Sequence, residues 1–156
     1  VRGLIEVPLI REVRVTVDQV VVNNSTTLTN VTDLKLPILA NEQWEMDVIV
    51  IYEANSAADV KTIWTAPAGC AVAQLHAQYY DAGTLATIAP AVVDALTQLD
   101  LGGVIDLGFQ GSLVATYHVT ASATAGDVQF QAAQLVAHAS DLKVKTYSRI
   151  VARKLN

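Results

Sequence analysis

The chain has 156 residues, of which 52% are hydrophobic and 16% are charged. This balance excludes an intrinsically disordered chain, because disorder requires few apolar and many charged residues. With 10 Lys and Arg against 15 Asp and Glu, the net charge is -5, so we expect no nucleic-acid partner held through its phosphates. A mean hydropathy of +0.36 with so few charges predicts that part of the surface is covered in an oligomer or a larger assembly.

The apolar residues predict no membrane segment, because every apolar run is interrupted well before about 18 residues. The opening residues also lack the basic and apolar regions of a signal peptide. Cys70 is the single cysteine, so neither an intramolecular disulfide nor a thiolate metal site is expected. We therefore expect stability to come from packing and from subunit contacts.

Residues 1–11 predict an arm that precedes a single domain over 12–156. Pro8 disfavours a regular strand there, and the apolar side chains of the arm need a surface to pack on. That surface is either the chain's own domain or a neighbouring subunit. The second alternative makes five arm residues candidates for subunit or capsid contact: Leu4, Ile5, Val7, Leu9 and Ile10.

Alternating apolar and polar residues predict β-strands, most clearly over 44–52 and 113–121. The inward faces are predicted to carry Trp44, Met46, Val48, Val50 and Tyr52 in the first segment, and Leu113, Ala115, Tyr117, Val119 and Ala121 in the second. Further strands are predicted at 13–22, 34–39, 59–65, 70–79, 104–109, 128–136 and 142–155. Turn residues separate these segments, and eight or nine strands at such spacing predict an all-β fold, an antiparallel β-sandwich or jelly roll.

One segment departs from the alternation. Between Pro90 and Leu101, apolar residues recur at three- and four-residue steps, with Pro90 at a first-turn position and Gly102 at a stop. This pattern predicts a short helix near 90–101. A β-hairpin around Asp94 is the alternative.

The chemically active side chains do not form a known catalytic or metal-binding motif. His76, His118 and His138 fall on three separate predicted strands, without the close spacing of metal ligands on one element. Asp94 and Asp100 are more simply interpreted as solvated polar residues than as a catalytic pair. Neither a nucleophile motif nor a phosphate-binding loop is present, so we expect no enzyme activity, no metal and no cofactor.

Four aromatic residues offer a different hypothesis, a platform that stacks on sugars: Trp44, Trp64, Tyr79 and Tyr80. The two tryptophans lie among apolar neighbours in alternating strands, which favours packing in the core. Tyr79 and Tyr80 at a strand end are typical of the rim of an interface.

Several segments together resemble a β-rich module of tailed-bacteriophage virion proteins. These segments are Asp33-Leu34-Lys35-Leu36-Pro37-Ile38, Ala40-Asn41-Glu42-Gln43-Trp44, Trp64-Thr65-Ala66-Pro67-Ala68-Gly69 and Ala125-Gly126-Asp127-Val128-Gln129-Phe130-Gln131. The resemblance implies a small capsid decoration protein, which binds the outside of an assembled phage capsid and stabilises it without chemistry. It also implies a homotrimer, the major capsid protein as partner, and a location on the virion exterior after assembly in the host cytoplasm. A tail or fibre module and a carbohydrate-binding adhesin are the alternatives.

The C-terminal segment is the one basic region of this acidic chain. Its cations are Lys143, Lys145, Arg149, Arg153 and Lys154. They either protect an edge strand from pairing with other chains or contact an acidic capsid surface. The second interpretation makes Arg149, Arg153 and Lys154 candidate contact residues.

Overall fold

The computed structural model describes residues 8–81, 84–88, 93–101 and 110–156. The described residues form strands joined by turns and contain no helix, which confirms the predicted all-β sandwich. The strands are β1 (Ile10–Arg14), β2 (Gln19–Asn23), β3 (Thr29–Ile38), β4 (Gln43–Glu53), β5 (Val60–Thr65), β6 (Ala71–Asp81), β7 (Thr84–Ile88), β8 (Val93–Asp94), β9 (Leu99–Leu101), β10 (Gly111–Thr120), β11 (Gly126–Gln134), β12 (Asp141–Val144) and β13 (Arg149–Lys154).

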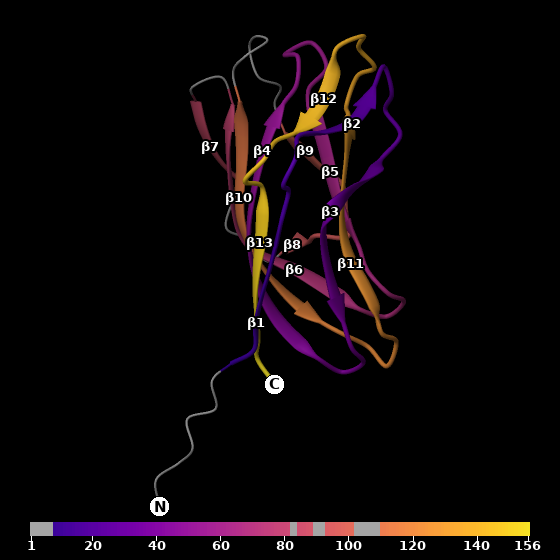
Figure 1. Cartoon of the computed structure of the whole chain (residues 1–156), viewed down its shortest axis with the longest axis vertical. Coiled ribbons are helices and arrows are strands. Elements are labelled where there is room, and N and C mark those ends of the chain that lie inside the picture. Colours follow the sequence, from indigo (N-terminus) through magenta and orange to yellow (C-terminus); the bar gives the residue numbers. More distant parts are fainter. Residues whose placement is uncertain (1–7, 82–83, 89–92, 102–109) are drawn as a thin grey trace, which may run out of the picture.

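The strands form two antiparallel sheets that face each other (Figure 1). The larger sheet has nine strands, with the order β1-β13-β4-β10-β6-β7 and with β2, β8 and β12 attached beside this path. The smaller sheet has four strands in the order β3-β11-β5-β9. The start of β1 and the C-terminus lie at the same end of the sandwich (Figure 1). Residues 8 and 9, the described part of the arm before β1, therefore lie at the same end as the C-terminus.

The core lies between the sheets and is built from alternate residues of each strand. All ten residues predicted to face inward on the segments 44–52 and 113–121 are buried. β4 and β10 pair in antiparallel register, with Val48 opposite Ala115 and Met46 opposite Tyr117, so their inward faces form one continuous apolar layer. Burial of this layer stabilises the sandwich by roughly 25 cal/mol per Å² of apolar area removed from water.

An aromatic cluster joins the two sheets. The Trp64 ring from β5 lies edge-to-face with Tyr117 of β10, at 5.3 Å between ring centroids, and with Phe130 of β11, at 5.2 Å. Edge-to-face geometry places the positive ring edge against a negative ring face, which stabilises such pairs beyond their buried area. The prediction that Trp44 and Trp64 pack in the core is confirmed, since both are buried.

The short helix predicted near 90–101 is wrong over 93–101, and residues 90–92 lie outside the described part of the chain. β8 pairs with β6 of the larger sheet, a turn follows, and β9 pairs with β5 of the smaller sheet. Ala95 in the turn donates its N–H to Val72 O and accepts a hydrogen bond from Trp64 N. The apolar spacing thus belongs to a turn that crosses between the sheets, not to the buried face of a helix.

Two segments predicted as single strands are each divided in two. The segment 13–22 is interrupted after β1, and the segment 142–155 is interrupted between β12 and β13. The two interruptions bind each other, because Val15 N donates to Ser148 O at 2.8 Å and Tyr147 N donates to Val15 O at 3.2 Å. The strand predicted at 104–109 lies outside the described residues.

Candidate functional site

The predicted arm contacts are only partly described. Leu4, Ile5 and Val7 lie outside the described residues. Leu9 and Ile10 are 50% and 60% exposed where the arm enters β1, and Leu9 O accepts a hydrogen bond from Lys154 N at 2.9 Å. Residues 10 and 11 of the predicted arm pair with β13 as part of β1.

Two further apolar side chains are exposed at the same end of the sandwich. Leu39 follows β3 and is 60% exposed, and Leu155 follows β13 and is 43% exposed. The backbone N of Leu155 donates to Gln43 O, and the backbone N of Leu39 donates to the Glu42 carboxylate, so both leucines lie beside the start of β4. We call this set, Leu9, Ile10, Leu39 and Leu155, the arm root.

The C-terminal basic residues are largely neutralised within the chain. Arg153 pairs with Glu45 at 2.8 Å and Lys154 pairs with Glu42 at 2.9 Å. Lys143 and Lys145 also have carboxylate partners, Asp141 at 3.7 Å for the first, and Asp18 at 2.5 Å with Glu53 at 3.4 Å for the second. These cations therefore do not form a free basic patch, and β13 is no edge strand, because β1 covers it.

Arg149 differs from its neighbours. It is exposed, and it has no carboxylate within 4.0 Å among the residues that the structure describes. In the register of β1 and β13 it lies opposite Arg14, whose guanidinium pairs with Glu12 at 2.5 Å. Two cations directly opposite each other on one sheet face are unfavourable.

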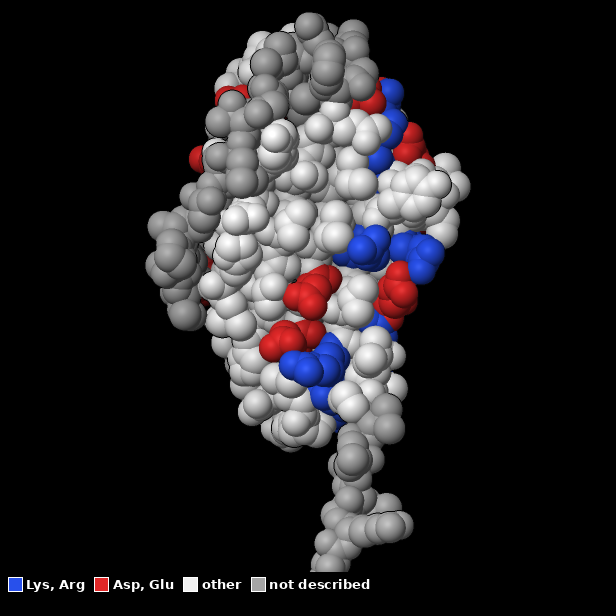
Figure 2. Space-filling model, turned by 90° about the vertical axis from the view of Figure 1, so that its left-hand side faces the viewer, with Lys and Arg blue, Asp and Glu red and all other residues white. Residues whose placement is uncertain are grey.

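The outward-facing residues of β10, of β6 from His76 to Tyr80 and of the second half of β4 up to Ile51 are uncharged. Figure 2 shows this side, with charged residues gathered along one border and in the lower part. The lack of cations follows from the sequence, because no Lys or Arg occurs between Lys61 and Lys143. We call this surface the neutral face; by strand phase and register it is formed by Ile49, Ile51, His76, Gln78, Tyr80, Ser112, Val114 and Thr116.

The structure does not bring the three histidines together. His76 of β6 and His118 of β10 share the outer face of neighbouring strands, whereas His138 follows β11 and accepts a hydrogen bond at Nδ1 from Ser140 N. No group of three or more His, Cys, Asp or Glu side chains suited to a metal occurs among the residues described. Cys70 is buried, with its sulfur 3.7 Å from the Ser122 hydroxyl.

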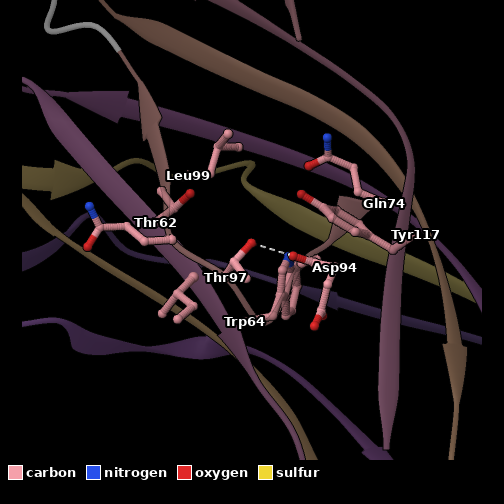
Figure 3. A pocket seen from close by; sticks show the side chains of 10 residues that line it. Thr62, Trp64, Gln74, Asp94, Thr97, Leu99 and Tyr117 are labelled. Atoms are coloured by element: carbon pink, nitrogen blue, oxygen red, sulfur yellow. Dashed lines mark hydrogen bonds between the residues drawn. The ribbon is translucent and has the colours of Figure 1, made fainter. Parts of the chain in front are cut away.

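One pocket opens between the sheets beside the β8–β9 turn (Figure 3). Asp94 shapes it as a turn residue: its carboxylate accepts a hydrogen bond from Leu96 N at 3.0 Å, and its carbonyl accepts one from the Thr97 hydroxyl at 2.6 Å. Asp100 instead accepts a hydrogen bond from the Gln98 side chain at 2.6 Å, so the two carboxylates have separate partners. The cavity of about 60 Å³ is far below the roughly 300–1,000 Å³ of small-molecule sites.

Two buried side chains that line this pocket have unusual surroundings. The Trp64 N–H has no hydrogen-bond partner among the described residues. Burial raises the pKa of Tyr117 to about 12, so its hydroxyl remains protonated at ordinary pH. With Trp44 and Trp64 buried, the proposed sugar platform loses both tryptophans, and only Tyr80, 46% exposed, and the partly buried Tyr79 remain near the surface.

No helical segment with the length and hydropathy to cross a membrane occurs in the described ranges.

Comparisons with known proteins give no family. No family model matches the chain, and no curated protein matches it. A crystal structure of the infectious bursal disease virus VP2 subviral particle is 13% identical, with a TM-score of 0.23, over 97% of this chain and 42% of that one. A structure of the Gt strain of the same virus is 12% identical, with a TM-score of 0.23, over 96% of this chain and 41% of that one. The chain spans less than half of these proteins, and such TM-scores do not establish a common fold.

Proposed function

We propose that this chain is a non-enzymatic structural protein of a virion, which binds the outside of an assembled phage capsid as a homotrimer and stabilises it. The observation that carries the proposal is the neutral face. The sequence resemblance to phage virion proteins supports it independently. A tail or fibre position on the virion is the alternative, and the same surfaces would serve there.

The neutral face suits contact with another copy of this chain. Val114 is 43% exposed and Tyr80 is 46% exposed on it, with Ile49 and Ile51 beside Val114 and Ser112. Without charges, this surface has no electrostatic reason to bind a charged partner, and it does not repel a copy of itself. Exposed apolar area of this kind is typical of a protein interface.

The dimensions of the neutral face limit what it can do alone. It spans residues 49–51 of β4, 76–80 of β6 and 112–116 of β10. At about 3.4 Å per residue and about 4.8 Å between strands, these segments cover roughly 200 Å² in projection. A stable interface buries about 800 Å² per partner. The neutral face would supply about a quarter of that area, so the arm must add contact area.

The arm root supports that second contribution. β1 is fixed by pairing with β13, so residues 8 and 9 before it lie at a defined end of the sandwich, where four apolar side chains are exposed. Arms from several subunits acting together gain from effective concentration, even where a single arm binds weakly. A protein that binds the assembled shell better than free shell subunits stabilises it by linkage.

Sedimentation equilibrium tests the trimer. We expect the mass of three subunits at micromolar concentration. The Val114→Glu variant should raise the dissociation constant of the trimer tenfold or more and so shift the protein toward monomer. Val136→Glu is the matched control, since Val136 is 56% exposed but follows β11, away from the neutral face. A mass of 16.6 kDa at every concentration would exclude the trimer in solution.

The location is tested on intact particles. An electron-microscopy map of the virion should contain density for the sandwich on the outer surface of the shell, in contact with the major capsid protein. Density in the tail or fibre would assign the alternative role.

A further inference from the structure

Tyr147 has an unfavourable backbone conformation, and contacts of its side chain within the chain do little to offset the cost. It lies in the turn between β12 and β13 with φ at +75°. This left-handed region is costly for a residue with a Cβ and is normally occupied by Gly, Asn or Asp. The Tyr147 side chain is 72% exposed, so little packing inside the chain offsets the cost.

The turn that carries Tyr147 is held firmly in place. Asp18 accepts hydrogen bonds from both the backbone N and the hydroxyl of Thr146, each at 2.8 Å, and pairs with Lys145 at 2.5 Å. The buried hydroxyl of Ser148 donates to Ile51 O at 3.2 Å and accepts from Ile51 N at 2.9 Å. The aromatic ring is therefore presented to solvent from a preorganised base, which lowers the entropy lost on binding.

A second exposed apolar side chain and a cation lie on the segments that adjoin the Tyr147 turn. Val17 lies in the turn that is hydrogen-bonded to the Tyr147 turn, and it is 71% exposed. Arg149 follows two residues after Tyr147 and has no ion-pair partner among the described residues. Tyr and Arg are the residue types that most often dominate the binding energy of protein interfaces.

We infer that Tyr147, Val17 and Arg149 form a docking knob for another protein, whose surface has an apolar recess with a carboxylate at its edge. The inference rests on the proposed function, in which that protein is the capsid shell. Insertion of the ring would offset the backbone strain, and the carboxylate would bind between Arg149 and Arg14, which lie opposite each other.

The charges around the knob favour this partner over two others. A second copy docking through the same surface would bring the unpaired Arg149 of each copy together, which like-charge repulsion opposes. A nucleic acid would be repelled by three carboxylates. Glu12 and Asp47 lie on the same sheet face as the two arginines, and Asp18 lies beside the Tyr147 turn. A single carboxylate in a protein surface avoids both conflicts.

Substitution of Tyr147 separates strain from binding. Tyr147→Asn removes the ring and places a residue that tolerates positive φ, so we expect a melting temperature a few degrees higher, together with at least tenfold weaker binding to purified undecorated capsids. Tyr147→Phe keeps the ring and should bind within about twofold of the unmodified protein. Arg149→Gln should weaken capsid binding about tenfold and reduce its salt dependence. Val136→Asn, which changes an exposed apolar residue elsewhere, should change neither quantity.

Each other outcome has a distinct meaning. If the unmodified protein does not bind capsids, the proposed function and the docking knob that rests on it are both wrong. If it binds and Tyr147→Asn binds equally well, only the docking knob is wrong. If Tyr147→Asn weakens self-association while capsid binding is unchanged, the knob contacts a second copy and the inference is overturned.

Discussion

The carboxylate of Glu42 fixes the indole of Trp44. Glu42 Oε2 accepts hydrogen bonds from Trp44 Nε1 at 3.0 Å and from Leu39 N at 2.8 Å, and Oε1 pairs with Lys154 Nζ at 2.9 Å. The guanidinium of Arg11 lies 4.8 Å from the centre of the same indole. This buried carboxylate thereby connects the β3–β4 turn with the end of β13, directly beside the arm root.

Glu42→Ala should therefore destabilise the domain strongly. The substitution leaves the buried Trp44 N–H and the Leu39 N–H without their acceptor, and unpaired buried donors cost about 1–3 kcal/mol each. We expect a loss of about 2–4 kcal/mol in urea denaturation. Glu45→Ala, which removes the exposed ion pair with Arg153, is the control and should cost less than about 1 kcal/mol. Equal losses for the two variants would contradict the role given to Glu42.

The acid limb of stability should depend on Asp18. Hydrogen bonds from Lys145 and Thr146 lower the pKa of Asp18 from 3.8 to about 2. Because this pKa is lowered by folding, its contribution is present above pH 3.8 and is lost as the pH falls toward 2. NMR titration of the carboxyl should give a pKa of about 2, and Lys145→Met should raise it toward the ordinary value. An unchanged value in that variant would show that Lys145 does not hold the carboxylate.

The strand phases can be tested with a buried and an exposed valine. Val48 of β4 is 1% exposed, so Val48→Asp places an unpaired charge in the core and should cost several kcal/mol or prevent folding. Val114 of the neighbouring strand β10 is 43% exposed, so Val114→Asp should leave the monomer folded. Circular dichroism on soluble protein would distinguish them, and a folded Val48→Asp variant with an unchanged melting temperature would contradict the described core.

Two truncations should distinguish the contribution of the arm from that of β1. Removing residues 1–7 should leave the melting temperature within a degree or two, because β1 and its pairing with β13 remain intact. Removing residues 1–14 deletes β1 and the contact of Arg11 with Trp44, and should lower the melting temperature by several degrees. The shorter deletion should still weaken capsid attachment or trimer formation tenfold or more. Unchanged attachment would remove the arm from the proposed function.

The sequence predicts the core well. A strand with one buried face alternates apolar and polar residues, and this two-residue period can be recognised within the segment itself. The phases of 44–52 and 113–121 follow from it directly. The turn at Tyr147 has no such signal, since neither Gly nor Pro marks it, and it is held by Val15 and Asp18 from the other end of the chain. For the same reason the sequence alone does not reveal the ion pairs of Arg153 with Glu45 and of Lys154 with Glu42, which depend on strand pairing.

The pairing of β1 with β13 affects how the protein folds during its synthesis. The first strand pairs with the last one, and β13 also separates β1 from β4 within the larger sheet. During synthesis β1 emerges from the ribosome more than a hundred residues before its partner, so it remains unpaired until translation of this chain reaches β13. Pairing between strands so distant in sequence is slow, and the unpaired strand edges exposed meanwhile are prone to aggregate. We therefore expect folding to depend on chaperones during expression, whereas the purified full-length chain should refold without them.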